Sequence, residues 1–470
     1  MLYNYQEKGV YQISKKLAVK NSVVGVSPTG SGKTVIISAI CHRYLEKNPD
    51  KKIIIFVHRE ELLNQTRNKI FSMFGLISQA IDSDTKTIQD VPIYVAMVKT
   101  FNNRVSDFFM SLFKDVGLLM IDEAHLGDFR SLYNTFPNLK RIGFTATPIS
   151  AVKKHPMNED WEDIVVIADV EELIELNSRM PNQGVVPAIE HTIKNIDRGS
   201  LKKKGSEFDE DFMGSVFSRK QQIQNTIDAY VKFSYSKKTL LFNANIEHSK
   251  KVTEAFVNAG FNARHIDGTF NKQKRRDTFK WVENEKDAIL CNVGIATIGT
   301  DIPSAESVIV NLGTTSITKY RQMIGRACRP YEYEEDFATG KSRYKEYFTI
   351  IDMGDNINGG NMGRFAEKIN WENYFRFPKK PGEGVAPVKE CPECMALNHA
   401  SATICQGFIW DFMYEENIPC GYIFPQQKTL EDTEEKEFIT LSNSVSINDV
   451  IEFFKDKNEW AGFYNILKGI

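Results

Sequence analysis

The sequence predicts an α/β protein whose 470 residues hold two parallel-sheet domains in tandem. Short, almost continuously apolar runs, such as Ile53–Val57 and Leu118–Ile121, alternate with helical patterns in the N-terminal part of the chain. The same alternation resumes near residue 222, with an apolar run at Thr239–Phe242. Strands buried on both faces give continuous apolar runs, and the helices between them form the crossovers of a parallel sheet. The pattern therefore favours βαβ units in both halves.

Breaks in this alternation set the domain boundaries that we expect. Charged and glycine-containing stretches interrupt it after residue 150, and the segment Phe377-Pro-Lys-Lys-Pro-Gly382 is typical of a linker. The expected organisation is a first α/β domain over 1–150, an inter-domain segment over 151–221, a second α/β domain over 222–378, a cysteine-rich module over 388–425 and a tail over 426–470.

The composition is that of an ordinary soluble protein, with 42% hydrophobic and 26% charged residues. No apolar run approaches the roughly 20 residues that span a bilayer, and the N-terminus lacks the pattern of a secretory signal. We therefore expect a cytoplasmic or nucleoid-associated protein that is not secreted and has no membrane partner. The net charge of −2 does not by itself indicate a nucleic-acid partner, because a local groove can be positive on a neutral protein.

A phosphate-binding loop is predicted at Ser27-Pro-Thr-Gly-Ser-Gly-Lys-Thr34, which follows one apolar run and opens a helical pattern. Its glycines let backbone N–H groups turn toward a phosphate at the helix N-terminus. Lys33 is placed to reach the β- and γ-phosphates, and the Thr34 hydroxyl to ligate Mg²⁺. The expected ligands are thus ATP and Mg²⁺, with binding residues Thr29, Gly30, Ser31, Gly32, Lys33 and Thr34.

Two carboxylates end the apolar run in Leu118-Leu-Met-Ile-Asp-Glu-Ala-His125. Such a pair after a strand is often only a helix start, but here it follows a phosphate-binding loop in the same α/β domain. We expect Asp122 to hold Mg²⁺ at the carboxyl end of the strand. Glu123 would orient the attacking water and accept its proton.

These residues resemble the motifs of superfamily 2 helicases, in the DEAH-type branch near the type III restriction-type and phage helicases. The resemblance covers roughly residues 1–355 in the order that the family has. Asp122–His125 and Gly143–Pro148 resemble motifs II and III. The other counterparts are Tyr5-Gln6 for the adenine-reading segment, Val57–Thr66 and Val95–Thr100 for motifs Ia and Ib, Thr239–Ala244 for motif IV, Asn292–Pro303 for motif V and Gln322–Arg329 for motif VI.

The resemblance implies two RecA-like domains with ATP between them. Arg326 and Arg329 would act from the second domain as arginine fingers, three residues apart on one face of a helix that starts near Thr318. Motif V departs from the usual pattern at Ile298, where close relatives carry Glu. The remaining implied roles are adenine reading by Gln6, a nucleotide-facing wall at Gly299 and Asp301, a contact of Gln322 with His125 in the catalytic set, and coupling by His125, Thr145 and Thr147.

A nucleic-acid track is expected over both domains, gripping the phosphate backbone without reading sequence. The basic run Lys272-Gln-Lys-Arg-Arg276 begins a predicted helix, and either a solvated helix face or a phosphate contact fits it. The other candidate contacts are Arg59, Gln65, Thr100 and Arg104 on the first domain and Asn243, His265 and Thr297 on the second.

Four late cysteines, Cys391, Cys394, Cys405 and Cys420, have a spacing that suggests a tetrahedral Zn²⁺ site. The Cys-Gly-aromatic ending at Cys420 resembles zinc-ribbon modules, although the usual pairing of the last two cysteines is absent. His399 would be a substitute ligand if one cysteine does not bind. A module that has lost its metal and keeps merely buried thiols is the alternative.

The function predicted is that of an ATP-dependent DNA helicase or translocase in replication, recombination or repair. Position 125 is His and motif VI opens with Gln322, which resembles DNA-acting motors more than RNA helicases. An RNA helicase, the motor subunit of a restriction system, and a non-catalytic nucleic-acid-binding scaffold are the alternatives. We expect a monomer that works with nucleic acid and with replication or recombination proteins.

Overall fold

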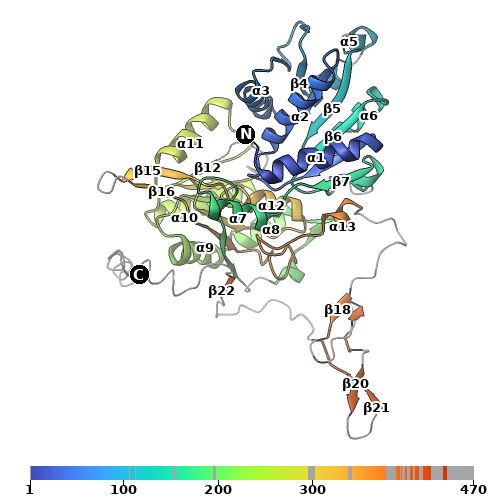
Figure 1. Cartoon of the computed structure of the whole chain (residues 1–470). Coiled ribbons are helices and arrows are strands. Elements are labelled where there is room, and N and C mark those ends of the chain that lie inside the picture. The colour runs from blue at the N-terminus through green and yellow to red at the C-terminus, as the bar shows by residue number, and fades with distance from the viewer. Residues whose placement is uncertain are drawn as a thin grey trace.

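The protein is described here by a computed structural model that shows two seven-stranded sheets flanked by helices, and a small group of short strands apart from them (Figure 1). Among the described residues, no helix is long and apolar enough to cross a membrane. The structure describes residues 2–104, 106–111, 113–151, 155–193, 197–294, 302–336, 341–376, 388–391, 393, 397–399, 403–405, 408–411, 416–424 and 438–441.

The first sheet is entirely parallel, in the order β3-β4-β2-β5-β6-β1-β7. Its central strands are buried on both faces, as the apolar runs predict. The strands are β1 (Ser22–Val26), β2 (Lys52–Val57), β3 (Ser78–Ile81), β4 (Ile93–Met97), β5 (Val116–Asp122), β6 (Lys140–Thr145) and β7 (Asp163–Val166). The helices are α1 (Asn4–Val19), α2 (Lys33–Lys47), α3 (Glu60–Phe74), α4 (Val98–Asn102), α5 (Asp107–Ser111), α6 (Arg130–Thr135) and α7 (Val170–Arg179).

The second sheet runs in the order β12-β13-β11-β14-β17-β8-β22, and only its edge strand β22 is antiparallel to its neighbour. Its strands are β8 (Ala188–Ile193), β11 (Thr239–Asn243), β12 (Ala263–Ile266), β13 (Ile289–Asn292), β14 (Ser307–Asn311), β17 (Phe348–Asp352) and β22 (Phe438–Leu441). The accompanying helices are α8 (Glu210–Phe217), α9 (Lys220–Ser234), α10 (Ile246–Asn258), α11 (Lys272–Asn284) and α12 (Ile317–Ile324), and the later helix α13 (Trp371–Phe375) packs on the first domain.

Short hairpins complete the described elements. Two belong to the second domain, and two form the small group of strands near the cysteines. They are β9 (Lys203–Lys204) with β10 (Glu207–Phe208), β15 (Glu332–Asp336) with β16 (Lys341–Tyr344), β18 (Val388–Glu390) with β19 (Leu397–His399), and β20 (Phe408–Asp411) with β21 (Glu416–Pro419).

The segment 151–221, expected to lie between the domains, divides between the two sheets. Strand β7 pairs with β1 in the first sheet, and β8 pairs with β17 in the second. The physical reason is that Ile164 and Val165, like Ile189 and Ile193, are buried by this pairing. The chain therefore crosses from one domain to the other between Val166 and Ala188.

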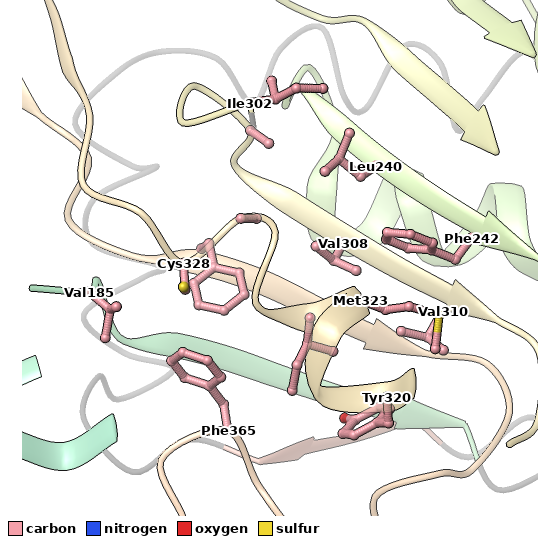
Figure 2. Packing of buried hydrophobic residues seen from close by; sticks show 14 of the residues in the cluster. Val185, Leu240, Phe242, Ile302, Val308, Val310, Tyr320, Met323, Cys328 and Phe365 are labelled. Carbon is pink, nitrogen blue, oxygen red and sulfur yellow. The ribbon is translucent and has the colours of Figure 1, made fainter. Parts of the chain in front are cut away.

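Packing of α12 on the second sheet places the residues that follow this helix. Figure 2 shows Met323 of α12 beside Val310 of β14, and the buried ring of Tyr320 on the same helix. Because Tyr320, Met323 and Ile324 are all buried, the helix cannot rotate or slide on the sheet without opening a cavity. The start of the next loop, at Gly325, is fixed by that packing.

Candidate nucleotide site

The loop between β1 and α2 has the backbone shape that phosphate binding requires. Gly30 and Gly32 have φ values of 88° and 76°, a left-handed conformation that side chains rarely adopt. The Ser27 N–H donates to the carbonyl of Thr145, which ties the start of the loop to the neighbouring strand end at 3.0 Å. The Lys33 ammonium lies back over the loop and donates to the Ser27 carbonyl at 3.1 Å. A cation and a helix N-terminus thus converge on one point.

The start of α1 is docked onto this loop. The Tyr5 hydroxyl donates to the Ser31 carbonyl at 2.7 Å, and the Gln6 amide donates to the same oxygen at 3.2 Å. Gln6 is 2% exposed, and its own carbonyl accepts the N–H of Tyr3. The structure therefore brings Gln6 together with the phosphate loop, and its adenine-reading role remains a prediction.

Asp122 and Glu123 lie at the carboxyl end of β5, across from this loop. Burial, and secondly the charge of Glu123, raise the pKa of Asp122 to about 7, while Lys33 opposes the shift. Such a buried carboxylate favours a nearby cation. Glu123 has a φ of 55°, a strained conformation for a residue with a side chain, and its N–H donates to Asp122 Oδ1 at 3.0 Å. The strain turns the Glu123 side chain off the strand and toward His125, whose Nδ1 lies 3.3 Å from Glu123 Oε2.

His125, Thr145 and Thr147 form one polar group inside the first domain. His125 Nδ1 lies 3.0 Å from Thr145 Oγ1, and the Thr147 N–H donates to the same hydroxyl at 3.0 Å. Burial lowers the pKa of His125, so the neutral ring is favoured. The three residues join the carboxylates to the end of β6, as a coupling role requires, while Gln322 is half-buried on α12 in the other domain.

The second domain reaches the phosphate loop through residues 325–329. The Cys328 thiol lies 3.6 Å from the Thr29 carbonyl oxygen, and a Cβ at Gly325 would come 3.2 Å from Thr29 Cβ. A Cβ at Gly30 would lie 3.7 Å from Cγ of Arg329. The two domains therefore meet at the loop where ATP is expected.

The position of the two arginines differs from the expectation. Helix α12 ends at Ile324 and is capped by Gly325, so Arg326 and Arg329 lie in the loop that follows the helix and not on one helical face. The Gly325 N–H still bonds to Arg321 O at 3.0 Å, and the chain then turns toward the first domain. Contact with Thr29 explains why the helix stops here, since a continued helix would carry these side chains away from the loop.

A pocket of about 50 Å³ adjoins this meeting point, lined by both domains and by the segment that follows the second sheet. Arg321 anchors that segment by donating to the carbonyls of Phe365 at 2.7 Å and Met362 at 3.1 Å. Phe375 then packs into the apolar core of the first domain. Sequence patterns gave no sign of this bridge. The lining residues are Pro28, Thr29, Ala146, Asp169, Val170, Arg321, Gly325, Phe365, Glu367, Ile369 and Trp371.

Three of the expected nucleic-acid contacts have hydrogen-bond partners within the fold. Asn243 is 3% exposed and donates to Ser249 Oγ at 3.2 Å. His265 contacts Ser249 and Asp267 through its two ring nitrogens, at 2.8 and 2.7 Å. Arg104 donates to the carbonyl of Thr85 at 2.6 Å. Asn243 is therefore turned inward, which corrects that prediction for this residue, whereas His265 and Arg104 are half-buried and their contacts with nucleic acid stay a prediction.

The remaining candidates differ in exposure. Gln65 on α3 is exposed, while Arg59 and Thr100 are half-buried. Thr297, Gly299 and Asp301 lie outside the described residues.

An open groove of about 820 Å³ lies beside His265, between β12 and the starts of α10 and α11. The exposed cations Lys250, Arg264 and Lys274 line it, together with Asp267 and Asp277. The basic run at the start of α11 thus contributes Lys274 to a shared cationic surface. Residues 272–276 do not all face this groove, because Arg275 donates to the carbonyl of Gly268 at 2.6 Å.

Three of the four late cysteines come together. The sulfur atoms of Cys391, Cys405 and Cys420 lie within 4.8 Å of one another, and those of Cys391 and Cys420 are 3.7 Å apart. Four thiolates at tetrahedral Zn–S distances would be about 3.8 Å apart, so this spacing fits zinc. Cys394 lies outside the described residues, whereas His399 is paired in β19 with Val388.

Known protein families match parts of both α/β domains. Residues 1–150 match the family described as type III restriction enzyme, res subunit, and residues 221–331 match the helicase conserved C-terminal domain. Together the two matches cover more than half of the chain.

Individual relatives come from several classes. A 51.5 kDa protein of a Lactococcus phage is 25% identical over 395 residues, which are 83% of this chain and 78% of the phage protein. The EcoAI type I restriction endonuclease subunit of Escherichia coli is 26% identical over 71% of this chain and 44% of the subunit. The ATP-dependent RNA helicase dbp3 of Sclerotinia sclerotiorum is 21% identical over 67% of this chain and 52% of the helicase. The chain thus spans about half the length of the last two proteins.

Solved structures confirm the predicted pair of RecA-like domains. A fragment named as an HsdR subunit of a type I restriction enzyme from Vibrio vulnificus has a TM-score of 0.58 at 17% identity, over 78% of this chain and 67% of the fragment. The type ISP restriction-modification enzyme LlaBIII, solved bound to DNA, has a TM-score of 0.51 at 17% identity, over 75% of this chain and 28% of the enzyme.

We expect Gly32→Ala, in the phosphate loop, to lower the affinity for ATP. A Cβ at Gly32 would lie 2.8 Å from Gln6 Nε2, on a backbone with φ of 76°. The loop must therefore shift, and we expect ATP affinity to fall by at least roughly tenfold, which corresponds to about 1.4 kcal/mol. Binding of a fluorescent ATP analogue measures this loss.

Gly75→Ala is the matched control. Gly75 also has a left-handed φ, of 68°, but it caps α3, and a Cβ there would meet nothing within 4 Å. This variant should lose about 1 kcal/mol of stability and keep wild-type ATP affinity. Equal ATP affinity in both variants would contradict the placement of Gly32 in the nucleotide site.

Proposed function

Because the chain belongs to the superfamily 2 helicases, we propose that it is a DEAH-type ATP-driven motor that moves along or remodels DNA in replication, recombination or repair. The observation that supports this most directly is the contact between the loop after α12 and the phosphate loop, where Cys328 lies 3.6 Å from the Thr29 carbonyl. A site shared by two domains lets ATP binding and hydrolysis close and open them. That motion is what a motor needs.

The side chains around this contact have complementary roles in the proposed reaction. Lys33 binds the phosphates of ATP, while Thr34 and Asp122 would hold Mg²⁺, which neutralises phosphate charge when it is bound. Burial of Asp122, which raises the pKa of its carboxyl to about 7, suits a cation ligand. Glu123 orients water and accepts its proton.

Charge on the transferring phosphoryl group would be stabilised from the second domain. Arg326 and Arg329 lie on the loop that contacts Thr29 and Gly30, so closure of the domains brings both guanidinium groups toward the γ-phosphate. Gln322, on the preceding helix, faces the same inter-domain region in the proposed closed state. Opening removes the arginines and releases the products.

DNA is the favoured track, over RNA. His125 and Gln322 stand at positions where the motif pattern differs from that of RNA helicases, and the structural relative LlaBIII was solved bound to DNA. The cations Lys250, Arg264 and Lys274 supply a surface for phosphates on the second domain. Gln65, Arg59 and Thr100 would continue the track on the first domain.

Two other functions have observations in their favour. The match to the res subunit of type III restriction enzymes favours the motor subunit of a restriction system, which would need its nuclease from another polypeptide. The resemblance to dbp3 favours an RNA helicase. Both share the ATPase chemistry proposed here and differ in the nucleic acid and the partner.

We further propose that the late cysteines bind Zn²⁺ in a small module that grips DNA or a partner protein. The three thiols that the structure describes, at Cys391, Cys405 and Cys420, have the spacing of a zinc site, and Cys394 would supply the fourth. Zinc would supply structural energy to these short hairpins and take no part in hydrolysis.

Steady-state ATP hydrolysis tests the proposed motor. We expect slow hydrolysis by the protein alone, strong stimulation by single-stranded or forked DNA, and little by RNA. Lys33→Ala should remove the activity, because the phosphates lose their cation. Greater stimulation by RNA would favour the RNA helicase, and no hydrolysis with any nucleic acid would contradict an autonomous motor.

If the groove lined by Lys250, Arg264 and Lys274 binds DNA phosphates, removing its cations should weaken the salt dependence of DNA binding. The variant Arg264→Ala with Lys274→Ala should need more DNA for half-maximal stimulation. Its slope of log affinity against log salt should fall by about 0.7 for each phosphate of a single strand that the variant no longer neutralises. Fluorescence anisotropy at several salt concentrations measures that slope.

Lys251→Ala is the control for the groove, because Lys251 is on α10 beside Lys250 but pairs with Glu247 at 2.7 Å. It should leave the salt slope unchanged. A double groove variant with the wild-type slope would show that nucleic acid binds elsewhere.

Metal analysis tests the cysteine module. We expect one bound zinc per chain, lost in Cys405→Ser and Cys420→Ser, because each removes a ligand. Cys41→Ser, at a thiol buried in the first domain, should keep the zinc. Mass spectrometry of the native protein counts the metal directly, and a zinc-free wild-type protein would contradict the proposal.

A further inference from the structure

We infer that Lys345 is a positioning residue for the ATPase reaction, holding the loop that carries Arg326 and Arg329. Lys345 lies between β16 and β17 and is 4% exposed. Its ammonium donates to three backbone carbonyl oxygens, those of Pro303 at 2.6 Å, Ala305 at 2.9 Å and Ala327 at 3.0 Å. An ammonium has three donors, so this arrangement uses all of them.

The three acceptors come from two separate segments. Pro303 ends the stretch that resembles motif V, and Ala305 lies just before β14. Ala327 lies between Arg326 and Arg329. One buried cation therefore joins the approach to β14 to the arginine loop, and a buried charge that lost these oxygens would remain unsolvated.

The arginine loop is held from both sides. On one side its Cys328 thiol contacts the Thr29 carbonyl, and Cys328 O accepts the N–H of Val186 at 2.8 Å. On the other side lies Lys345, whose own N–H donates to the carbonyl of Tyr331 at 2.8 Å. Between the end of α12 at Ile324 and the start of β15 at Glu332 there is no helix or strand, so isolated bonds from Val186 and Lys345 hold this stretch.

The proposed ATPase rate depends more on where the arginine loop lies than on how much the loop stabilises the fold. Misplacement of a catalytic group by about 1 Å can cost roughly 100-fold in rate, while the fold itself tolerates such a shift. The inference rests on the proposed role of the two arginines. It assigns to Lys345 the task of keeping them in register with the phosphate loop when the domains are closed.

A second, half-buried lysine offers a control. Lys237 is in the same domain, donates to Thr349 Oγ1 at 3.0 Å, and lies 4.9 Å from the ring of Tyr347. Burial lowers the pKa of Lys237 to about 8. Its hydrogen bond to Thr349 does not reach the arginine loop, so its removal tests the cost of losing a half-buried lysine elsewhere in the domain.

The first measurement is DNA-stimulated ATP hydrolysis by Lys345→Met, Lys345→Arg and Lys237→Met. We expect Lys345→Met to lower kcat by roughly 10- to 100-fold with KM for ATP nearly unchanged. Lys345→Arg keeps the charge and some donors and should fall between Lys345→Met and the wild type. Lys237→Met should lower the melting temperature but keep wild-type kcat. In the background of Arg326→Ala, Lys345→Met should cost much less, because the positioned group is gone.

The second measurement does not need activity. Cys328 and Cys291 are both buried in the second domain, at 1% and 0% exposure. Thiol labelling followed by mass spectrometry should find Cys328 modified roughly tenfold faster in Lys345→Met, with Cys291 unchanged, because only the arginine loop opens. If Lys345→Met does not fold, the same comparison is made in Lys345→Arg.

These outcomes distinguish a failure of the proposed function from a failure of the inferred role of Lys345. A wild-type protein without ATPase activity would contradict the proposed function, and the labelling of Cys328 would still decide whether Lys345 holds the loop. Wild-type kcat in Lys345→Met, equal losses of kcat in Lys345→Met and Lys237→Met, or equal acceleration of labelling at Cys328 and Cys291 would each overturn the inference.

Discussion

The nucleotide site depends on one close approach between the domains, the packing of residues 325–329 against the phosphate loop. The approach is close because the residues at the contact are small. A Cβ at Gly325 would come 3.2 Å from Thr29 Cβ, and the slender thiol of Cys328 lies 3.6 Å from the Thr29 carbonyl. A larger side chain at Gly325 or Cys328 would push the arginine loop away from the phosphate loop. Even a small displacement of catalytic groups slows a reaction strongly. Three other interactions hold residues 325–329 in this position. They are the packing of α12 on the second sheet, the hydrogen bonds of Arg321 and, as we infer, those of Lys345.

Much of the site could be predicted because its signals are local. The loop Ser27–Thr34 and the pair Asp122-Glu123 each follow an apolar strand directly, and the carboxyl ends of parallel strands meet at one edge of a sheet. Lys345 and Arg321 could not be found in this way. The carbonyl oxygens that Lys345 binds lie between 18 and 42 residues away along the chain, and any residue type supplies a carbonyl. Only the folded chain shows which lysine has such partners.

The expectations that differed from the structure have related causes. The pattern after Thr318 predicted a helix but did not include the contact that ends it at Ile324, so two arginines were assigned to a helical face. Asn243 stands where motif IV suggests a nucleic-acid contact, yet it is buried and donates to Ser249 on α10, which also bonds to the half-buried His265. The groove next to them, with Lys250, Arg264 and Lys274, has the exposed cations that phosphate binding needs. Motif position predicts a region, and burial decides which of its side chains face outward.

The cysteine module is flanked along the chain by elements of both domains. Before the module, α13 packs against the first domain, where Phe375 is 3% exposed in its core. After the module, β22 joins the second sheet as an antiparallel neighbour of β8 (Figure 1). Its two attachment points therefore belong to different domains. Arg321 adds a third link, because it ties the segment before α13 to the helix that precedes the arginine loop. Rotation of one domain against the other would therefore change the distance between α13 and β22, the described elements that flank the module along the chain.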